Sequence, residues 1–240
     1  MVGNMPSKNT ERHSHSSSRF LSDFILGSQD GLVNVLGIIL GVSAATSDIR
    51  IIFVAALAAL GAESVSMGAV AYTSTLARRR YYLGELKREK KEMQEVPKTE
   101  RKEIINILKG WGYKGRALKE MTSHIVSNPK AMLEFMMSFE LSLSPVGESQ
   151  PLRSFTTVLL STIFGSVIPL LPFLFFTHNI LWGAIASVII SGIFLFIIGY
   201  YEAKYTIGSL WRSGMQLLII GLAAGLVGYL IGHFVGAVPL

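Results

Sequence analysis

The run LWGAIASVIISGIFLFIIGYY, residues 181–201, contains no charged side chain, and it decides the fold class. A helix that crosses a bilayer needs about 20 predominantly apolar residues. The whole chain has the same bias, because 50% of its 240 residues are hydrophobic and only 16% are charged. A soluble domain would carry about a quarter of charged residues. The sequence therefore predicts an all-α membrane protein.

Five apolar segments are long enough to span a membrane. In chain order they cover residues 24–45, 51–72, 155–176, 181–201 and 215–238. A charged insert with helical periodicity separates the second and third spans, and we expect three or four helices in it. The expected division is a tail (1–22), transmembrane helices one and two (23–77), a helical inserted domain (78–153) and transmembrane helices three to five (154–240).

The basic residues predict the orientation, because Lys and Arg gather on the cytoplasmic side of membrane proteins. With five spans, the tail, the insert and the turn after span four share one side, and the opposite side holds Arg50 alone. The sequence RRR at 78–80 directly follows span two, where this bias is strongest. We therefore expect a cytoplasmic tail and insert and an external C-terminus. The positive charge favours contact with anionic lipid rather than nucleic acid.

Several classes of chemistry are excluded by composition. The chain has no cysteine, which rules out disulfides, thiolate metal sites and cysteine nucleophiles. We find no nucleophile–base–orienter set and no nucleotide-binding loop, so we expect no enzyme. The N-terminal stretch has no apolar core, so it is not a cleavable signal peptide. Its HSH sequence at 13–15 could bind a metal, but a solvated disordered tail is the simpler interpretation.

The insert places carboxylates together on helix faces. Residues three or four apart share a face, and the groups that do so are Glu85/Glu89/Glu92, Glu100/Glu103 and Met136/Glu140. Taken singly, salt bridges with nearby Lys and Arg explain the glutamates, and a hydrophobic seam explains the methionines. If the helices pack together, they can offer several carboxylates and one thioether to one centre. Carboxylates alone suit Mg²⁺, Ca²⁺ or Mn²⁺, and an added sulfur favours Fe²⁺ or Zn²⁺.

Two of the spans contain acidic residues. Asp30 lies inside span one, and Glu63 and Met67 are four residues apart in span two. A charge at mid-membrane costs about 2.5–3.5 kcal/mol on insertion scales, so such carboxylates usually mark an ion path. The alternative is a carboxylate near the interface that is hydrogen-bonded to a neighbouring helix. Glycines four residues apart, such as Gly37 and Gly41, allow helices to approach closely.

The ordered motifs of the chain resemble those of the vacuolar iron transporter family, over roughly residues 20–235. They are GSQDGLVNVLGIILGVS, ESVSMGAVAY, YYLGELKREKKEM with VPKTERKEI, FMMSFELSL, SVIPLLPFLF and RSGMQLLIIGLAAG. The combination of FMMSFEL with the preceding glutamate-rich helix pair is the most specific of these features.

The resemblance implies a divalent-metal/proton antiporter with five spans, which works as a homodimer with the path between the two copies of span one. It also implies that an inserted cytoplasmic domain collects metal. The implied ligands in that domain are Glu89 and Glu92 of REKKE, Glu100 and Glu103 of TERKE, and Met136 and Glu140 of MMSFE. In the membrane they are Asp30 of DGL and Met67 of SMG. Many members carry an acid where this chain has Ala59, and Glu63, one turn later, is the candidate substitute.

We therefore expect a transporter that moves Fe²⁺, with Mn²⁺ and Zn²⁺ as further candidates, out of the cytoplasm in exchange for protons. It would need no prosthetic group, and its partners would be metal ions, protons, the lipid bilayer and a second copy of the chain. A prokaryotic cell membrane is the expected location, or a vacuolar membrane if the source is eukaryotic. The alternatives are a membrane-anchored metal sensor or buffer and a transporter of organic solutes.

Overall fold

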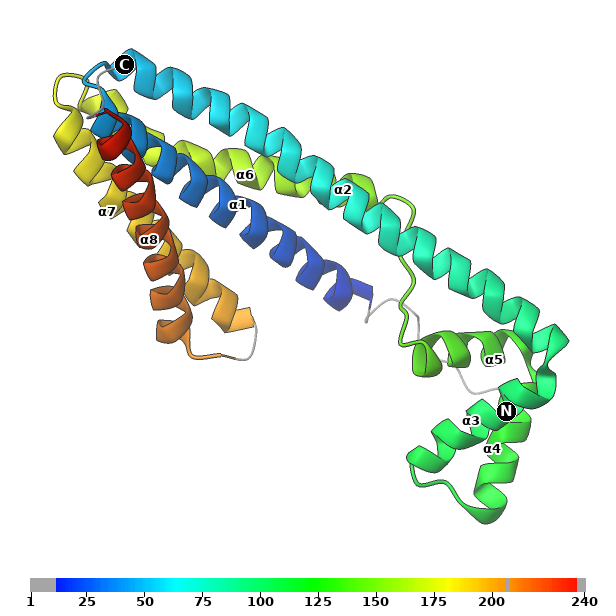
Figure 1. Cartoon of the computed structure of the whole chain (residues 1–240). Helices are drawn as coiled ribbons and strands as arrows, with labels where there is room; N and C mark the ends of the chain where they lie inside the picture. Colours follow the sequence, from blue (N-terminus) through cyan, green and yellow to red (C-terminus); the bar gives the residue numbers. More distant parts are fainter. Residues whose placement is uncertain (1–11, 206–207, 237–240) are drawn as a thin grey trace. The chain divides into compact units, whose positions relative to one another are not determined.

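The computed structural model describes residues 12–205 and 208–236 (Figure 1). Within them every regular element is helical, which confirms the predicted all-α class. The helix α1 begins at Arg12, so the end of the expected tail is helical rather than irregular. Residues 1–11 lie outside the described part of the chain, as do the side chains of the HSH sequence.

Among the described residues, five helices are long and apolar enough to cross a membrane, as the hydropathy pattern predicts. They are α1 (Arg12–Ala45), α2 (Ile49–Glu95), α6 (Gln150–Phe175), α7 (Ile180–Tyr205) and α8 (Leu210–Gly236). The chain forms two compact units. We call residues up to Tyr72 and from Leu152 onward the membrane unit, and Thr73–Pro151 the insert unit. The apolar part of α2 ends at Tyr72, so its polar continuation belongs to the insert unit.

Helix α1 contacts the other helices of the membrane unit. It packs against α7 and α8, and its residues Val35 and Ile39 form a buried cluster with residues of α2 and α6. The contact with α8 runs backbone to backbone, because a Cβ atom added to Gly232 would clash with the carbonyl oxygen of Gly41. The predicted close approach at these glycines is therefore confirmed, and it fixes α1 firmly in its unit.

Helix α6 continues through Pro169 and Pro172. Proline lacks the backbone N–H donor and usually kinks or breaks a helix, but this helix is continuous. The hydroxyl of Ser187 on α7 donates a hydrogen bond of 2.8 Å to the carbonyl oxygen of Pro169, and the bond is buried. This bond ties α7 to α6 beside the two prolines.

The insert unit contains short helices that follow the polar part of α2. They are α3 (Pro97–Gly110), α4 (Gly115–Ser127), α5 (Pro129–Phe135) and the π-helix η1 (Met136–Glu140). Asn128 caps α5, because its Oδ1 accepts hydrogen bonds from the backbone N–H groups of Lys130 and Ala131 at 3.1 and 3.2 Å. The buried core of the unit contains Ile104, Leu108, Met132, Phe135 and Met136.

Candidate metal centre

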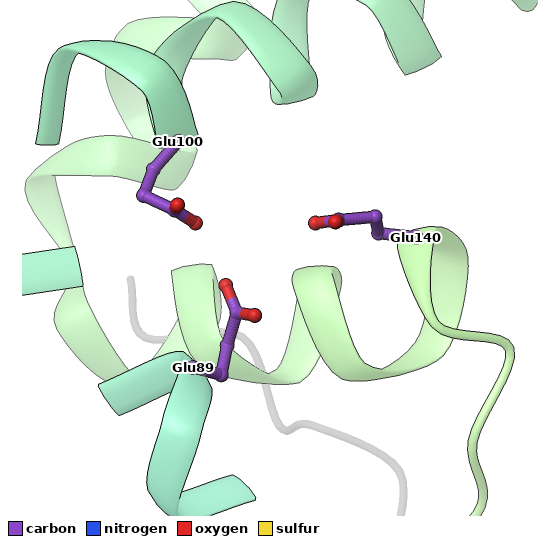
Figure 2. Close-up of side chains that lie close together, drawn as sticks. All are labelled: Glu89, Glu100 and Glu140. Atoms are coloured by element: carbon purple, nitrogen blue, oxygen red, sulfur yellow. The ribbon is translucent and has the colours of Figure 1, made fainter. Parts of the chain in front are cut away.

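Three glutamates from three different elements converge in the insert unit. Glu89 lies on α2, Glu100 on α3 and Glu140 at the end of η1. Each offers one carboxylate oxygen, and these oxygens all lie within 4.8 Å of one another. Figure 2 shows the three side chains pointing toward a common space. We call this set the glutamate triad.

Two members of the triad are buried without compensation. Glu89 is 1% exposed and Glu100 is 3% exposed. The Oε1 atom of Glu89 and the Oε2 atom of Glu100 have no hydrogen-bond partner among the described residues. Burying an ionised carboxylate is costly unless it is paired or coordinates a metal. The pair therefore requires a bound cation or a proton.

Burial and mutual repulsion raise the pKa values of carboxyl groups in and beside the triad. The pKa of Glu89 is raised to about 8. Burial is the main cause, and the nearby carboxyl groups of Glu100, Glu140 and Glu92 add to the rise. Burial also raises the pKa of Glu140 and that of Glu103, and neighbouring carboxylates add to both shifts. Glu89 therefore holds a proton near neutral pH when no other cation is present. A divalent cation that enters must compete with that proton.

The π-helix positions Glu140. In η1 the backbone N–H of Leu141 donates to the carbonyl of Met136, five residues back, at 3.1 Å. The wider turn rotates the end of the segment relative to a continuing α-helix, and the chain then leaves through Ser142, whose φ is +53°. Such π-segments occur frequently at functional sites. The helical periodicity of the insert does not distinguish this π-turn from a continuing α-helix.

The other residues predicted for the insert site lie around the triad. The side chain of Glu92 is 40% exposed and pairs with Arg88, with 3.6 Å between Oε1 and Nε. Glu103 is half-buried, close enough to Glu100 and Glu92 to feel their charges. Met136 is fully buried in the hydrophobic core. The structure thus brings together three of the predicted ligands, leaves two carboxylates at the edge and places the methionine in the core.

In the membrane unit, the predicted residues Asp30 and Glu63 are neighbours. The two carboxyl groups lie close enough to interact. The side-chain amide of Asn34 on α1 donates a hydrogen bond to Oε1 of Glu63 on α2. The sequence did not identify Asn34 as a site residue, and its spacing of four from Asp30 was the signal that could have linked it to the carboxylates. Met67 is half-buried on α2.

Asn34 and Glu63 line a groove of about 890 Å³ that α1, α2 and α8 form. Most of the remaining lining is apolar, and it extends to Thr46 near the end of α1. Ala59 also lines this groove. Glu63 and Ala59 therefore face the same groove. This agrees with their spacing of four residues, which puts both on one face of α2.

The described chain combines five candidate membrane spans, carboxylates within two of them and a glutamate triad in the insert, which defines a multi-pass membrane protein. The model of the VIT family matches residues 21–233, and the chain belongs to this family. The resemblance noted from the motifs is thereby confirmed.

Relatives match over most of their length. Vacuolar iron transporter 1 of Arabidopsis thaliana is 31% identical over 226 residues, which cover 94% of this chain and 90% of the relative. Vacuolar iron transporter 2 of Oryza sativa subsp. japonica is 32% identical over 217 residues, or 90% of this chain and 87% of the relative. The vacuolar iron transporter of Plasmodium falciparum is 28% identical over 233 residues, with 94% and 85% covered.

Proposed function

We propose that this protein moves a divalent transition metal, Fe²⁺ first and Mn²⁺ or Zn²⁺ as further substrates, out of the cytoplasm in exchange for protons. The observation that carries the proposal is the glutamate triad, with two buried carboxylates that lack a compensating charge. The family membership supports it, because the relatives are named for iron transport. The working unit would be a homodimer in the lipid bilayer.

In the capture step, Glu89, Glu100 and Glu140 would bind the incoming ion. Three carboxylates supply hard oxygen ligands and enough negative charge to neutralise a divalent cation. Glu92 and Glu103 would complete the coordination from the edge, and the thioether of Met136 would add a soft ligand. A site without Cys or His binds transition metals weakly, and weak binding allows release into the membrane path.

In the transfer step, Asp30 and Glu63 would accept the ion inside the membrane, with Asn34 orienting Glu63 and Met67 as the soft ligand. A carboxylate binds either a proton or a metal ion, so loading with metal displaces protons. We propose that this competition is the basis of the exchange. Dimerisation through α1 would place two copies of Asp30 beside one path, which strengthens the competition through mutual repulsion.

Metal flux into proteoliposomes tests the proposal. The wild-type protein should transport Mn²⁺, a divalent ion that is stable in air, and a pH gradient should drive the flux. The triple variant Glu89→Gln, Glu100→Gln, Glu140→Gln should lose capture. Glu120→Gln is the matched control, since Glu120 is an exposed glutamate that pairs with Arg116 on α4 outside the triad. Metal binding without flux would instead identify a membrane-anchored sensor or buffer.

A further inference from the structure

Arg88 connects the carboxylates around the triad. Its Nη2 lies 2.7 Å from Oε2 of Glu85, and its Nε lies 3.6 Å from Oε1 of Glu92. The guanidinium group also acts on Glu140, because its charge opposes the rise in the pKa of that residue. One cation therefore touches two carboxylates of α2 and influences a third on η1.

We propose that Arg88 is an internal counter-ion of the metal centre, which competes with the bound metal and thereby keeps metal binding weak and reversible. The inference rests on the proposed function, because it assigns the control of affinity at the same site. It concerns a residue that supplies no ligand atom to the metal.

The physical argument begins with charge. In the metal-free protein, the positive charge of Arg88 lies at the edge of a cluster that contains two uncompensated buried carboxylate oxygens. A divalent ion bound to the triad introduces two further positive charges near this guanidinium. Like charges repel, and the side chain of Arg88 is 52% exposed, so water screens the repulsion without removing it.

Ligand availability adds to the effect. Glu92 can turn toward a bound ion only if it leaves Arg88, and Glu85 competes for the same guanidinium. An arginine is suited to this role because its planar fork has several N–H donors and can hold two carboxylates at once. Metal binding thus exchanges one set of ion pairs for another. Such an exchange changes the free energy little in either direction, so the bound metal ion can be released readily.

The test measures Mn²⁺ affinity of the full-length protein in detergent by titration calorimetry. Arg88→Gln removes the charge and should tighten binding by about tenfold, as expected for the loss of a half-screened repulsion. Arg88→Met is a second neutral variant that should tighten binding in the same way. Arg88→Lys keeps the charge and should remain within about threefold of the wild type.

Lys91→Gln is the matched control. Lys91 lies on the same helix and pairs with Glu95 at 3.5 Å, with the same spacing of four residues. The substitution Lys91→Gln removes one positive charge from a residue that does not pair with the triad, so the Mn²⁺ affinity should stay unchanged. In proteoliposomes, Arg88→Gln should lower the half-saturating concentration of Mn²⁺ and slow the maximal flux, which a purely structural role would not do.

The outcomes separate the two proposals. If the wild type binds no Mn²⁺, the proposed metal centre fails and this inference fails with it. If the wild type binds and both neutral Arg88 variants bind equally or more weakly, only the role of Arg88 is overturned. If Lys91→Gln tightened Mn²⁺ binding as much as the Arg88 variants, the change in affinity would come from net charge alone. That result would also overturn the proposed role of Arg88.

Discussion

Glu89 and Glu100 point toward each other from α2 and α3, both almost fully buried, and each has a carboxylate oxygen without a hydrogen-bond partner in the described part of the chain. Burying two carboxylates this close together is costly unless a cation or a proton compensates their charge. We therefore expect protonation, metal binding and the stability of the insert unit to be coupled.

The stability of the metal-free insert should fall as the pH rises. The pKa of Glu89 is about 8 in the folded protein and near 4.5 when unfolded. The folded state therefore holds this proton more strongly, and the resulting stabilisation is complete below about pH 4.5. It declines as the pH rises and is lost once the pH passes 8. Hydrogen exchange of α3 in the full-length protein should accelerate between pH 5 and 8 after correction for the intrinsic rate. In Glu89→Gln the acceleration should largely vanish, and an unchanged profile would contradict the assignment.

The triad should dominate metal affinity. Glu100→Gln keeps the shape of the side chain but removes a charged ligand, so we expect at least about a tenfold loss of Mn²⁺ affinity. Glu120→Gln should bind like the wild type. Titration calorimetry of the purified full-length protein measures both. Equal affinities for the two variants would mean that the triad is only a structural cluster.

Met136→Leu separates the soft ligand from the core residue. Met136 is fully buried, and leucine has nearly the same volume, so the loss of folding stability should stay below about 1.5 kcal/mol. Loss of the thioether should weaken Fe²⁺ and Zn²⁺ binding much more than Mn²⁺ binding. Competition titrations with the three ions provide the measurement. A uniform loss for all ions would assign Met136 to packing alone.

Asp30→Asn should abolish proton-coupled metal flux. The substitution keeps the shape of the side chain and removes the charge that metal and proton share. Metal binding by the insert should remain, because the triad lies in a different compact unit. Flux into proteoliposomes and calorimetry on the same sample give the two readouts. Normal flux in this variant would place the path elsewhere.

The absence of cysteine makes the orientation directly testable. Ser123→Cys introduces an exposed thiol into α4 of the insert, and Ser47→Cys introduces one between α1 and α2. In intact cells, a membrane-impermeant maleimide should label the thiol at position 47 and leave that at position 123 unlabelled until the membrane is opened. The reverse pattern would show that the insert faces outward.

The sequence by itself determined the number and position of the spanning helices and the existence of a helical insert. Hydropathy and helical period are local properties, so residues 181–201 reveal a span without reference to any other segment. The same period placed Glu89 and Glu92 on one face of α2, and the motifs indicated the family.

Only the tertiary structure decided which of the predicted ligands meet. A helical period identifies a face but not the element that packs against it. The packing of α3 and η1 in the insert unit selected Glu89, Glu100 and Glu140, placed Glu92 beside Arg88, and put Met136 in the core. The hydrogen bond between Asn34 and Glu63 likewise depends on how two helices meet. Contacts between residues distant in sequence arise from side-chain packing in three dimensions, which no local pattern encodes.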